Sequence, residues 1–248
     1  MGFRVYETIP NSPDENQLVA AFDSRTGKLH GLIISSRVGT MRTGAIGGVA
    51  IDHLARKNAS VMGVIGSGRQ ARAQILAATE VRDIEAVRIY SPTKRNREDL
   101  AAEMHNELSG SVEAVDTPKA AVTGAAIVST ATSSSEPVID HAWLDPGCHL
   151  NMLGLKFIDR HEVAPDIRHF ADVIVTDSLA QIQSYDSQFF FEQSEQMDEM
   201  VELSALVDAE MAGRMENNDI SLFCSVGLAG TEIVLAQAAL ERNHNKEP

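Results

Sequence analysis

The sequence contains few cysteines, few aromatic residues and few cations for its length. Cys148 and Cys224 are the only cysteines among 248 residues, which excludes a disulfide framework and a cysteine-rich zinc site. We interpret both as buried thiols, as expected in the reducing cytoplasm. Lysine and arginine number 21 against 35 acidic residues, giving a formal net charge of −14. Because nucleic-acid binding needs a basic face that neutralises phosphates, this charge argues against a nucleic-acid partner.

Long hydrophobic runs and metal-ligand spacing are also missing. No apolar stretch reaches the roughly 20 residues that a membrane helix needs. The first residues, MGFRVYETIP, lack the basic and apolar regions of a signal peptide. We therefore expect no membrane partner. The eight histidines show no metal-ligand spacing, so we also expect no metal site. The length permits one large domain or two unequal ones.

Short apolar segments alternate with helical patterns through the middle of the sequence. Apolar strands are predicted at 61–65, 86–90, 111–115, 125–130, 148–153 and 172–177. Such alternation is typical of a parallel, doubly wound α/β sheet, which we place at residues 49–205. Outside it, the pattern predicts a hairpin over 17–36, a helix over 40–56 and an amphipathic helix near the C-terminus.

The turn after the first of these strands has a dinucleotide-binding pattern. Gly66-x-Gly68-x-x-Ala71 follows the strand VMGVI and opens a helix. The first glycine permits a tight turn, the second lets the backbone approach a pyrophosphate, and the small third residue keeps the helix close to the sheet. Amides at the helix start then face the phosphates. We predict that the whole turn binds the dinucleotide: Gly66, Ser67, Gly68, Arg69, Gln70 and Ala71.

The end of the next strand bears on which dinucleotide is bound. An acidic residue there favours NAD, because it accepts hydrogen bonds from the ribose hydroxyls. Here the strand ends in YSPTKRNR, and no carboxylate occurs before Glu98. Ser91, Thr93, Lys94 and Arg95 suit a 2′-phosphate, which favours NADP over NAD. The alternative is a solvated helix start, although the helix dipole disfavours cations at that position.

Five segments together resemble the ornithine cyclodeaminase/mu-crystallin family. They occur in family order: RTGA at 42–45, GSGRQA at 66–71, STATSSSEPV at 129–138, GCHLNMLG at 147–154 and SLFCSVGLAGTE at 221–232. The resemblance implies a Rossmann-like NAD(P)-binding domain at 49–205. It also implies a smaller α+β domain, built from residues 1–48 and 206–248, that binds substrate and forms a homodimer. Enzymes of this family move a hydride between a nicotinamide and the α-carbon of an amino or imino acid.

The same resemblance implies roles for individual residues. Arg42 is expected to bind the substrate α-carboxylate, which suits a forked guanidinium, and Arg4 stands where the family usually has a substrate-binding lysine. Further residues are expected around the nicotinamide and the substrate: Thr130, Ala131, Thr132 and Ser225 for the cofactor, and Val226 and Gly227 for the substrate. Ordinary turn chemistry is the alternative for both loops.

Two features depart from the family pattern. Family chains normally begin earlier, so we expect the smaller domain to be only partly present in this chain. In ornithine cyclodeaminases the loop after LNMLG carries an aspartate, and Lys156 occupies that position here. A lysine at the carboxyl end of a strand acts as a general acid or base if desolvation lowers its pKa, or as a fixed charge for a second carboxylate. We expect Lys156 to be catalytic.

These features predict a cytoplasmic NAD(P)-dependent oxidoreductase that acts on a small amino or imino acid. The reaction would be that of a ketimine reductase or an amino-acid dehydrogenase. Two alternatives stay open. One is an ornithine cyclodeaminase-type ammonia lyase that recycles its NAD, and the other is a catalytically silent NADP-binding protein.

Overall fold

The computed structural model describes residues 1–6, 17–192, 194–211, 213–228 and 230–244. The chain forms two compact units, Met1–Thr43 with Leu228–Pro248 and Gly44–Gly227, and each is described by itself. Helix α1 (Arg37–Leu54) begins in the first unit and ends in the second. The unit boundaries differ from the expected 48/49 and 205/206, chiefly because residues 206–227 contribute a strand to the larger unit.

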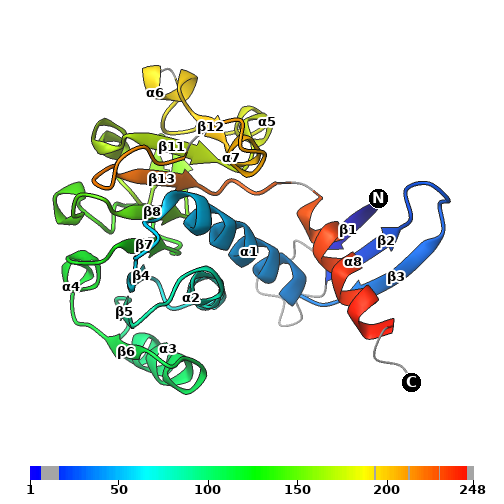
Figure 1. Ribbon diagram of the computed structural model, residues 1–248, viewed down its shortest axis with the longest axis horizontal. Helices are drawn as coiled ribbons and strands as arrows, with labels where there is room; N and C mark the ends of the chain where they lie inside the picture. Colours follow the sequence, from blue (N-terminus) through cyan, green and yellow to red (C-terminus); the bar gives the residue numbers. More distant parts are fainter. Residues whose placement is uncertain (7–16, 193, 212, 229, 245–248) are drawn as a thin grey trace. The chain divides into compact units, whose positions relative to one another are not determined.

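The larger unit contains an eight-stranded sheet with the order β12-β11-β13-β8-β7-β4-β5-β6 (Figure 1). Its strands are β4 (Val61–Ile65), β5 (Ala86–Tyr90), β6 (Ser111–Ala114), β7 (Ile127–Thr130), β8 (His149–Met152), β11 (Val173–Thr176), β12 (Val201–Glu202) and β13 (Ser221–Cys224). All neighbouring strands pair in parallel. The predicted Rossmann-like α/β fold is therefore confirmed, and so are all six predicted strands.

One central strand lies outside the predicted set. β13 lies between β11 and β8, although it is the last strand along the chain. Its four residues are all buried, so the segment shows no period-2 alternation that would identify a strand. This strand places residues 206–227 with the large sheet and not, as expected, with the smaller domain.

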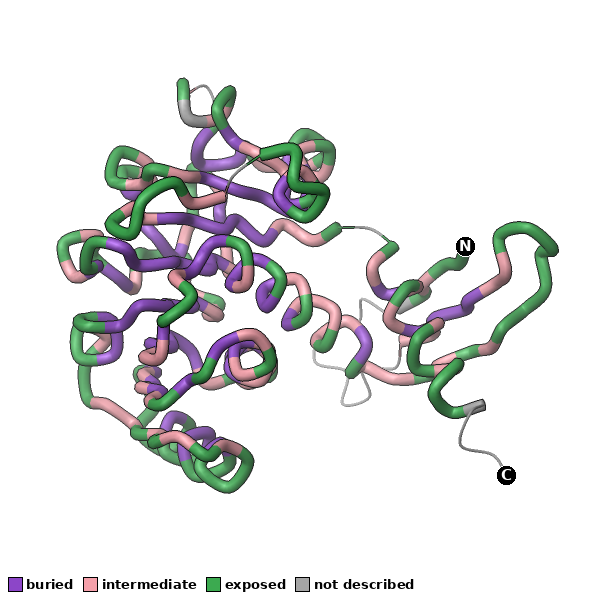
Figure 2. Tube along the Cα trace, in the orientation of Figure 1, coloured by how far each residue is buried: buried purple, intermediate pink, exposed green. Residues whose placement is uncertain are grey.

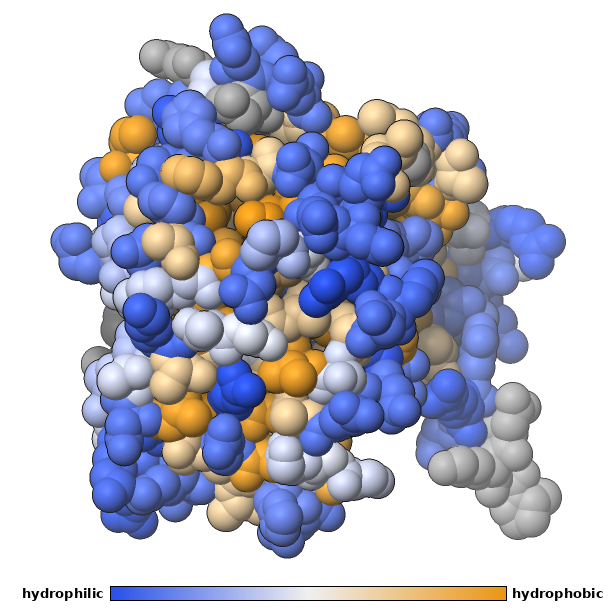
Figure 3. Space-filling view, turned by 60° about the vertical axis from the view of Figure 1, so that its left-hand side comes forward, coloured by the Kyte–Doolittle hydropathy of each residue, from blue (hydrophilic) through white to orange (hydrophobic). Residues whose placement is uncertain are grey.

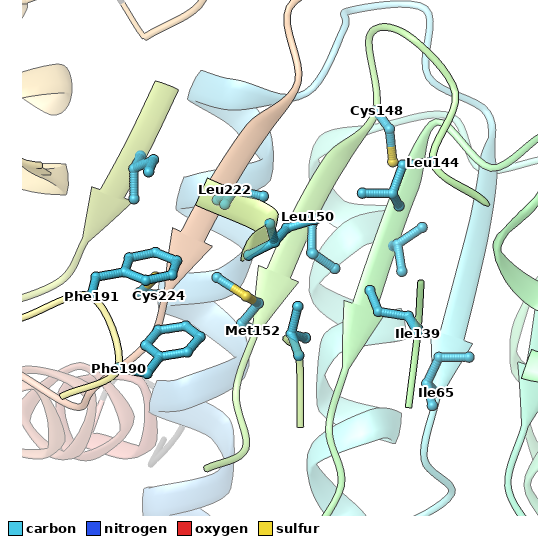
Figure 4. Close-up of a cluster of buried hydrophobic side chains, with 14 of the residues drawn as sticks. Ile65, Ile139, Leu144, Cys148, Leu150, Met152, Phe190, Phe191, Leu222 and Cys224 are labelled. Carbon is cyan, nitrogen blue, oxygen red and sulfur yellow. The ribbon is translucent and has the colours of Figure 1, made fainter. Parts of the chain in front are cut away.

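Helices cover both faces of the large sheet, and the central strands β7, β8 and β13 are buried throughout, whereas the edge strands β6 and β12 are not (Figure 2). On one face, α1, α2 (Arg69–Val81) and α3 (Lys94–Glu107) pack against Met62 and Val64 of β4 and their neighbours. The other face packs against α4 (Pro118–Val122) and the aromatic run 189–191. In this core Phe190 and Phe191 stack with ring centroids 4.0 Å apart, beside Met152 and Cys224 (Figure 4).

The remaining elements of the larger unit are short and lie between the sheet strands. They are η1 (His141–Trp143), β9 (Lys156–Phe157), β10 (Arg160–His161), η2 (Pro165–Phe170), α5 (Leu179–Gln183), α6 (Glu195–Asp198) and α7 (Leu203–Val207). Strands β9 and β10 pair in an antiparallel hairpin, which directly follows β8 and bears on the site below.

The smaller unit is a three-stranded antiparallel sheet covered on one face by α8 (Thr231–His244). The strands are β1 (Gly2–Tyr6), β2 (Gln17–Phe22) and β3 (Leu29–Ile34), which confirms the predicted hairpin. Val19 and Ile33 pack against Ala236 of α8. The opposite face carries apolar side chains that are between 51% and 69% exposed: Phe3, Val5, Leu32 and Ile34.

None of the described helices combines the length and the apolar character needed to cross a membrane. The face of the molecule in Figure 3 carries mainly hydrophilic side chains, with hydrophobic ones between them.

Candidate active site

The carboxyl ends of β4 and β7 meet where the strand order reverses. β5 and β6 lie on one side of β4, and β7 and β8 lie on the other. The Ala131 amide donates to the Ile65 carbonyl oxygen at 2.8 Å, and the Gly66 amide donates to the Tyr90 carbonyl oxygen at 2.8 Å. The loops after β4, β5 and β7 therefore start side by side. Open α/β sheets bind their ligands in the crevice at this switch point.

The glycine turn has the geometry of a phosphate cradle. Gly66 has a φ of +121°, and a Cβ there would overlap the carbonyl oxygen of Ala131, so only glycine fits. Gly68 is the N-cap of α2, with no capping side chain, and a Cβ at Gly68 would meet no described atom within 4 Å. Ala71 is fully buried, which keeps α2 against the sheet. The space beside Gly68, where α2 begins, is thus open, as binding of a pyrophosphate at a helix N-terminus requires.

The residues predicted to hold a 2′-phosphate surround the start of α3. Ser91 is buried, and its hydroxyl lies 3.0 Å from that of Ser67 in the glycine turn. Lys94 and Arg95 point outward from the first turn of α3, after its N-cap Thr93. Both are exposed, and each forms a long ion pair, of 3.7 and 3.5 Å respectively, with a carboxylate one turn later.

Arg69 and Gln70 open α2, directly after Gly68. The Oε1 atom of Gln70 is buried, with no hydrogen-bond donor among the described residues.

A buried carboxylate joins the ends of β7 and β8. Glu162 is fully buried and accepts hydrogen bonds from the Thr130 and Thr132 hydroxyls, both at 2.8 Å. It also accepts from the backbone amides of Thr132, at 3.0 Å, and Gly154. The hydroxyls of two residues expected to bind the cofactor are therefore directed at a protein carboxylate. No local sequence pattern marks Glu162, because its partners lie at distant positions in the chain.

Lys156 begins β9 and is only 5% exposed. Its ammonium donates to the Gly154 carbonyl oxygen at 2.5 Å. Burial lowers the pKa of Lys156, while the nearby carboxylates of Glu162 and Asp177 act in the opposite direction. Lys156 is thus a desolvated amine held at the carboxyl end of a central strand.

The loop after β13 is tied to the neighbouring strands. Asp177, which follows β11, accepts hydrogen bonds from the backbone amides of Val226 at 2.7 Å and Gly227 at 2.9 Å. The Ser225 amide donates to the Met152 carbonyl oxygen at 3.0 Å, and the Tyr185 hydroxyl donates to the Val226 carbonyl oxygen at 2.7 Å. The larger unit therefore brings the loops containing Ser225–Gly227, Thr130–Thr132 and Lys156 to one edge of the sheet.

Arg4 and Arg42 lie together in the smaller unit. Both guanidinium groups contact the Oε1 atom of Glu232, which begins α8, and the Arg42 Nε atom does so at 2.9 Å. Arg42 Nη1 is buried and has no hydrogen-bond acceptor among the described residues. Glu232 is a second carboxylate that no local pattern marks as a site residue, although it lies in the segment SLFCSVGLAGTE.

Within the described part of the chain, no three His, Cys, Asp or Glu side chains are grouped to hold a metal ion. Cys148 and Cys224 are free and buried, as predicted. Burial raises the pKa of each thiol to about 12, so both remain neutral.

Comparisons with known proteins identify the family. The model of the ornithine cyclodeaminase/mu-crystallin family matches residues 4–247. An uncharacterized cyclodeaminase of Sinorhizobium fredii is 31% identical, with 93% of this chain and 71% of the relative covered.

Two solved structures are also similar. The Delta(1)-pyrroline-2-carboxylate reductase of Thermococcus litoralis, in complex with NADH and L-proline, has a TM-score of 0.81 and 30% identity, covering 93% of this chain and 72% of the other. An archaeal alanine dehydrogenase dimer with bound NAD has a TM-score of 0.86 and 25% identity, covering 99% of this chain and 78% of the other. The chain belongs to the ornithine cyclodeaminase/mu-crystallin family.

Proposed function

We propose that this protein transfers a hydride at the α-carbon of a small amino or imino acid, as an NAD(P)-dependent imine reductase or amino-acid dehydrogenase. The observation that carries the proposal is the pairing of an open glycine turn at the switch point with a buried lysine at the end of β8. The solved relatives that bind NADH with L-proline, or NAD, support this assignment.

Different residues of the chain are assigned to cofactor binding and to proton transfer. The amides after Gly68 would hold the pyrophosphate, and the loops at Ala131 and Ser225 would hold the nicotinamide end. A bound nicotinamide supplies or accepts the hydride. Lys156 holds a proton at Nζ, next to the place of the substrate nitrogen, and burial makes that proton easier to release. Lys156 is thus the general acid in the reductive direction and the general base in the oxidative one.

Binding of the substrate carboxylate is assigned to the two arginines of the smaller unit. Arg4, Arg42 and Glu232 sum to one positive charge, which matches one substrate carboxylate. The buried Arg42 Nη1 atom, without an acceptor among the described residues, is a donor available to that carboxylate.

NADP is the preferred cofactor in this proposal. The support is local: β5 is followed by Ser91, whose hydroxyl is engaged with the glycine turn, and then by exposed Lys94 and Arg95. A carboxylate that would select the ribose hydroxyls of NAD does not occur between Tyr90 and Glu98.

The protein is also proposed to be a cytoplasmic homodimer. The apolar face of Phe3, Val5, Leu32 and Ile34 suits a second copy of the chain, because a contiguous exposed apolar surface marks an interaction site. The alanine dehydrogenase relative is described as a dimer. Sedimentation velocity of Ile34→Lys against wild type tests this point: a dimer that persists in the variant places the interface elsewhere.

The decisive experiment follows NADPH and NADH absorbance with a panel of cyclic and acyclic imino acids, and measures ammonia release from ornithine in parallel. Stoichiometric oxidation of the reduced cofactor supports the proposal. Ammonia release without net cofactor turnover would make the protein a cyclodeaminase, which the lysine at position 156 disfavours. Cofactor binding without either reaction would make it a silent NADP-binding protein.

A further inference from the structure

We propose that Glu162 is the positioning residue of this site. It holds the loops after β7 and β8 in the arrangement that places residues 130–132 against the cofactor and Lys156 against the substrate. This inference rests on the proposed function for its catalytic meaning, but its structural content can be measured independently.

Glu162 is connected to both loops in a way that filling space would not require. The fully buried carboxylate receives hydrogen bonds from Thr130, Thr132 and Gly154, four donors in all. Burying a carboxylate is costly unless such donors surround it. An apolar residue would avoid that cost but would leave the Thr132 and Gly154 amides unpaired.

The fold leaves room for this carboxylate and delivers it from a third segment. A Cβ on Gly154 would overlap the Glu162 carboxylate, so glycine is needed for its close approach. Glu162 directly follows β10, and its amide donates to the Leu155 carbonyl oxygen at 3.0 Å, while the Val138 amide donates to the Glu162 carbonyl oxygen at 2.9 Å. The β9–β10 hairpin thereby fixes the carboxylate relative to Lys156.

The charge of Glu162 also bears on Lys156. Two carboxylates act on this ammonium against the effect of burial: Glu162 and Asp177. Glu162 is thus one of two carboxylates that favour the protonated amine. Removing its charge while keeping its shape therefore alters both the loop geometry and the proton affinity of Lys156.

Glu162→Gln is the test. A carboxamide offers a single acceptor oxygen. Each Glu162 oxygen accepts from one hydroxyl and one backbone amide, so the new amino group faces either the Gly154 or the Thr132 amide, and that hydrogen bond is lost. Hydrogen exchange at residues 130–134 and 153–157 is expected to accelerate by about 10-fold or more, as for loss of charge-assisted bonds. The expected kinetic result is a fall in kcat larger than the rise in KM for the imino acid, with the alkaline limb of the pH–kcat profile moved to lower pH.

Asp172→Asn is the matched control. Asp172 accepts the Ile220 amide at 2.8 Å before β11 and β13, at the opposite edge of the same sheet. It should change neither the exchange of the two loops nor the pH profile. If Glu162→Gln resembles this control in both measurements, Glu162 is only a structural group and the proposal is wrong.

A milder variant covers the case in which Glu162→Gln does not fold. Thr132→Val removes one hydroxyl donor and keeps the amide, so faster exchange at 153–157, across the carboxylate from the substitution, is expected. Unchanged exchange there would overturn the proposal. If the wild type reduces no imino acid but these exchange effects appear, the proposed reaction fails while the positioning role stands.

Discussion

Arg42 and Glu232 form an ion pair in which the guanidinium Nε atom lies 2.9 Å from the carboxylate Oε1 atom. Arg4 contacts the same oxygen, so one carboxylate holds together both arginines assigned to the substrate. Their side chains are 17% exposed for Arg42 and 23% for Arg4. The arginines are therefore oriented by the protein before any substrate arrives, which lowers the cost of ordering them on binding.

Arg42→Ala should raise the KM for an imino acid by about 10- to 100-fold and change kcat much less, because a carboxylate contact made equally in ground and transition states contributes to binding alone. The measurement is steady-state kinetics with a carboxylate substrate. Arg37→Ala, an exposed residue that starts the same helix, serves as the control. A comparable rise in KM for Arg37→Ala would remove the assignment.

Substitution of the two glycines of the turn by alanine should affect different properties of the protein. Gly66→Ala should destabilise the protein, because the residue has a φ of +121° and its Cβ would overlap Ala131. Gly68→Ala should leave the thermal unfolding midpoint unchanged, since its Cβ meets no described atom within 4 Å. It should nonetheless weaken NADPH binding, because the methyl group enters the space of the pyrophosphate. Calorimetric titration and thermal unfolding of both variants check this contrast.

Lys156→Met should reduce kcat by about 100-fold or more while leaving NADPH affinity close to wild type, because it removes a proton-transfer group and retains the volume of the side chain. Lys119→Met, on the short helix α4, provides the control. Retention of wild-type kcat in Lys156→Met would assign proton transfer to another group or to water.

NADPH should stabilise the wild type against heat more than NADH at equal concentration, because tighter binding to the folded state raises the unfolding midpoint. The double variant Lys94→Ala/Arg95→Ala should abolish this difference by weakening the contact with the 2′-phosphate. Its response to NADH should stay as in wild type. Greater stabilisation of the wild type by NADH would contradict the preference for NADP.

His149 should make the protein less stable as the pH falls below about 6.5. Burial lowers the pKa of this imidazole from 6.5 to about 3, so between these values the unfolded chain binds a proton that the folded protein does not. The contribution is complete above the unfolded pKa, and it decreases with falling pH by at most about 1.4 kcal/mol per pH unit.

Denaturant unfolding between pH 5 and pH 8 measures this slope. In His149→Asn the slope should decrease, whereas in His105→Asn, at an exposed position of α3, it should remain. An unchanged slope in His149→Asn would mean that other groups produce the dependence.

Local sequence patterns were enough to predict most strands of the large sheet and the glycine turn. β4 and β5 are apolar runs with a turn motif or a polar loop behind them, and these signals lie within about a dozen residues. Glu162 and Glu232 gave no such signal. The roles of these two carboxylates depend on hydrogen-bond and ion-pair partners that are far away in the sequence. Thr130 is 32 residues from Glu162, and Arg4 is 228 residues from Glu232, so only the folded chain brings them together.

The position of β13 has a consequence for the order in which the molecule folds. The ribosome delivers Ser221–Cys224 after every other strand, yet this segment lies between β8 and β11. During synthesis the edges of β8 and β11 that pair with β13 therefore remain unpaired until β13 has been made. Such late, long-range pairing slows folding and prolongs the exposure of unpaired strand edges. A nascent chain that stalls before residue 221 therefore leaves the facing edges of β8 and β11 unpaired.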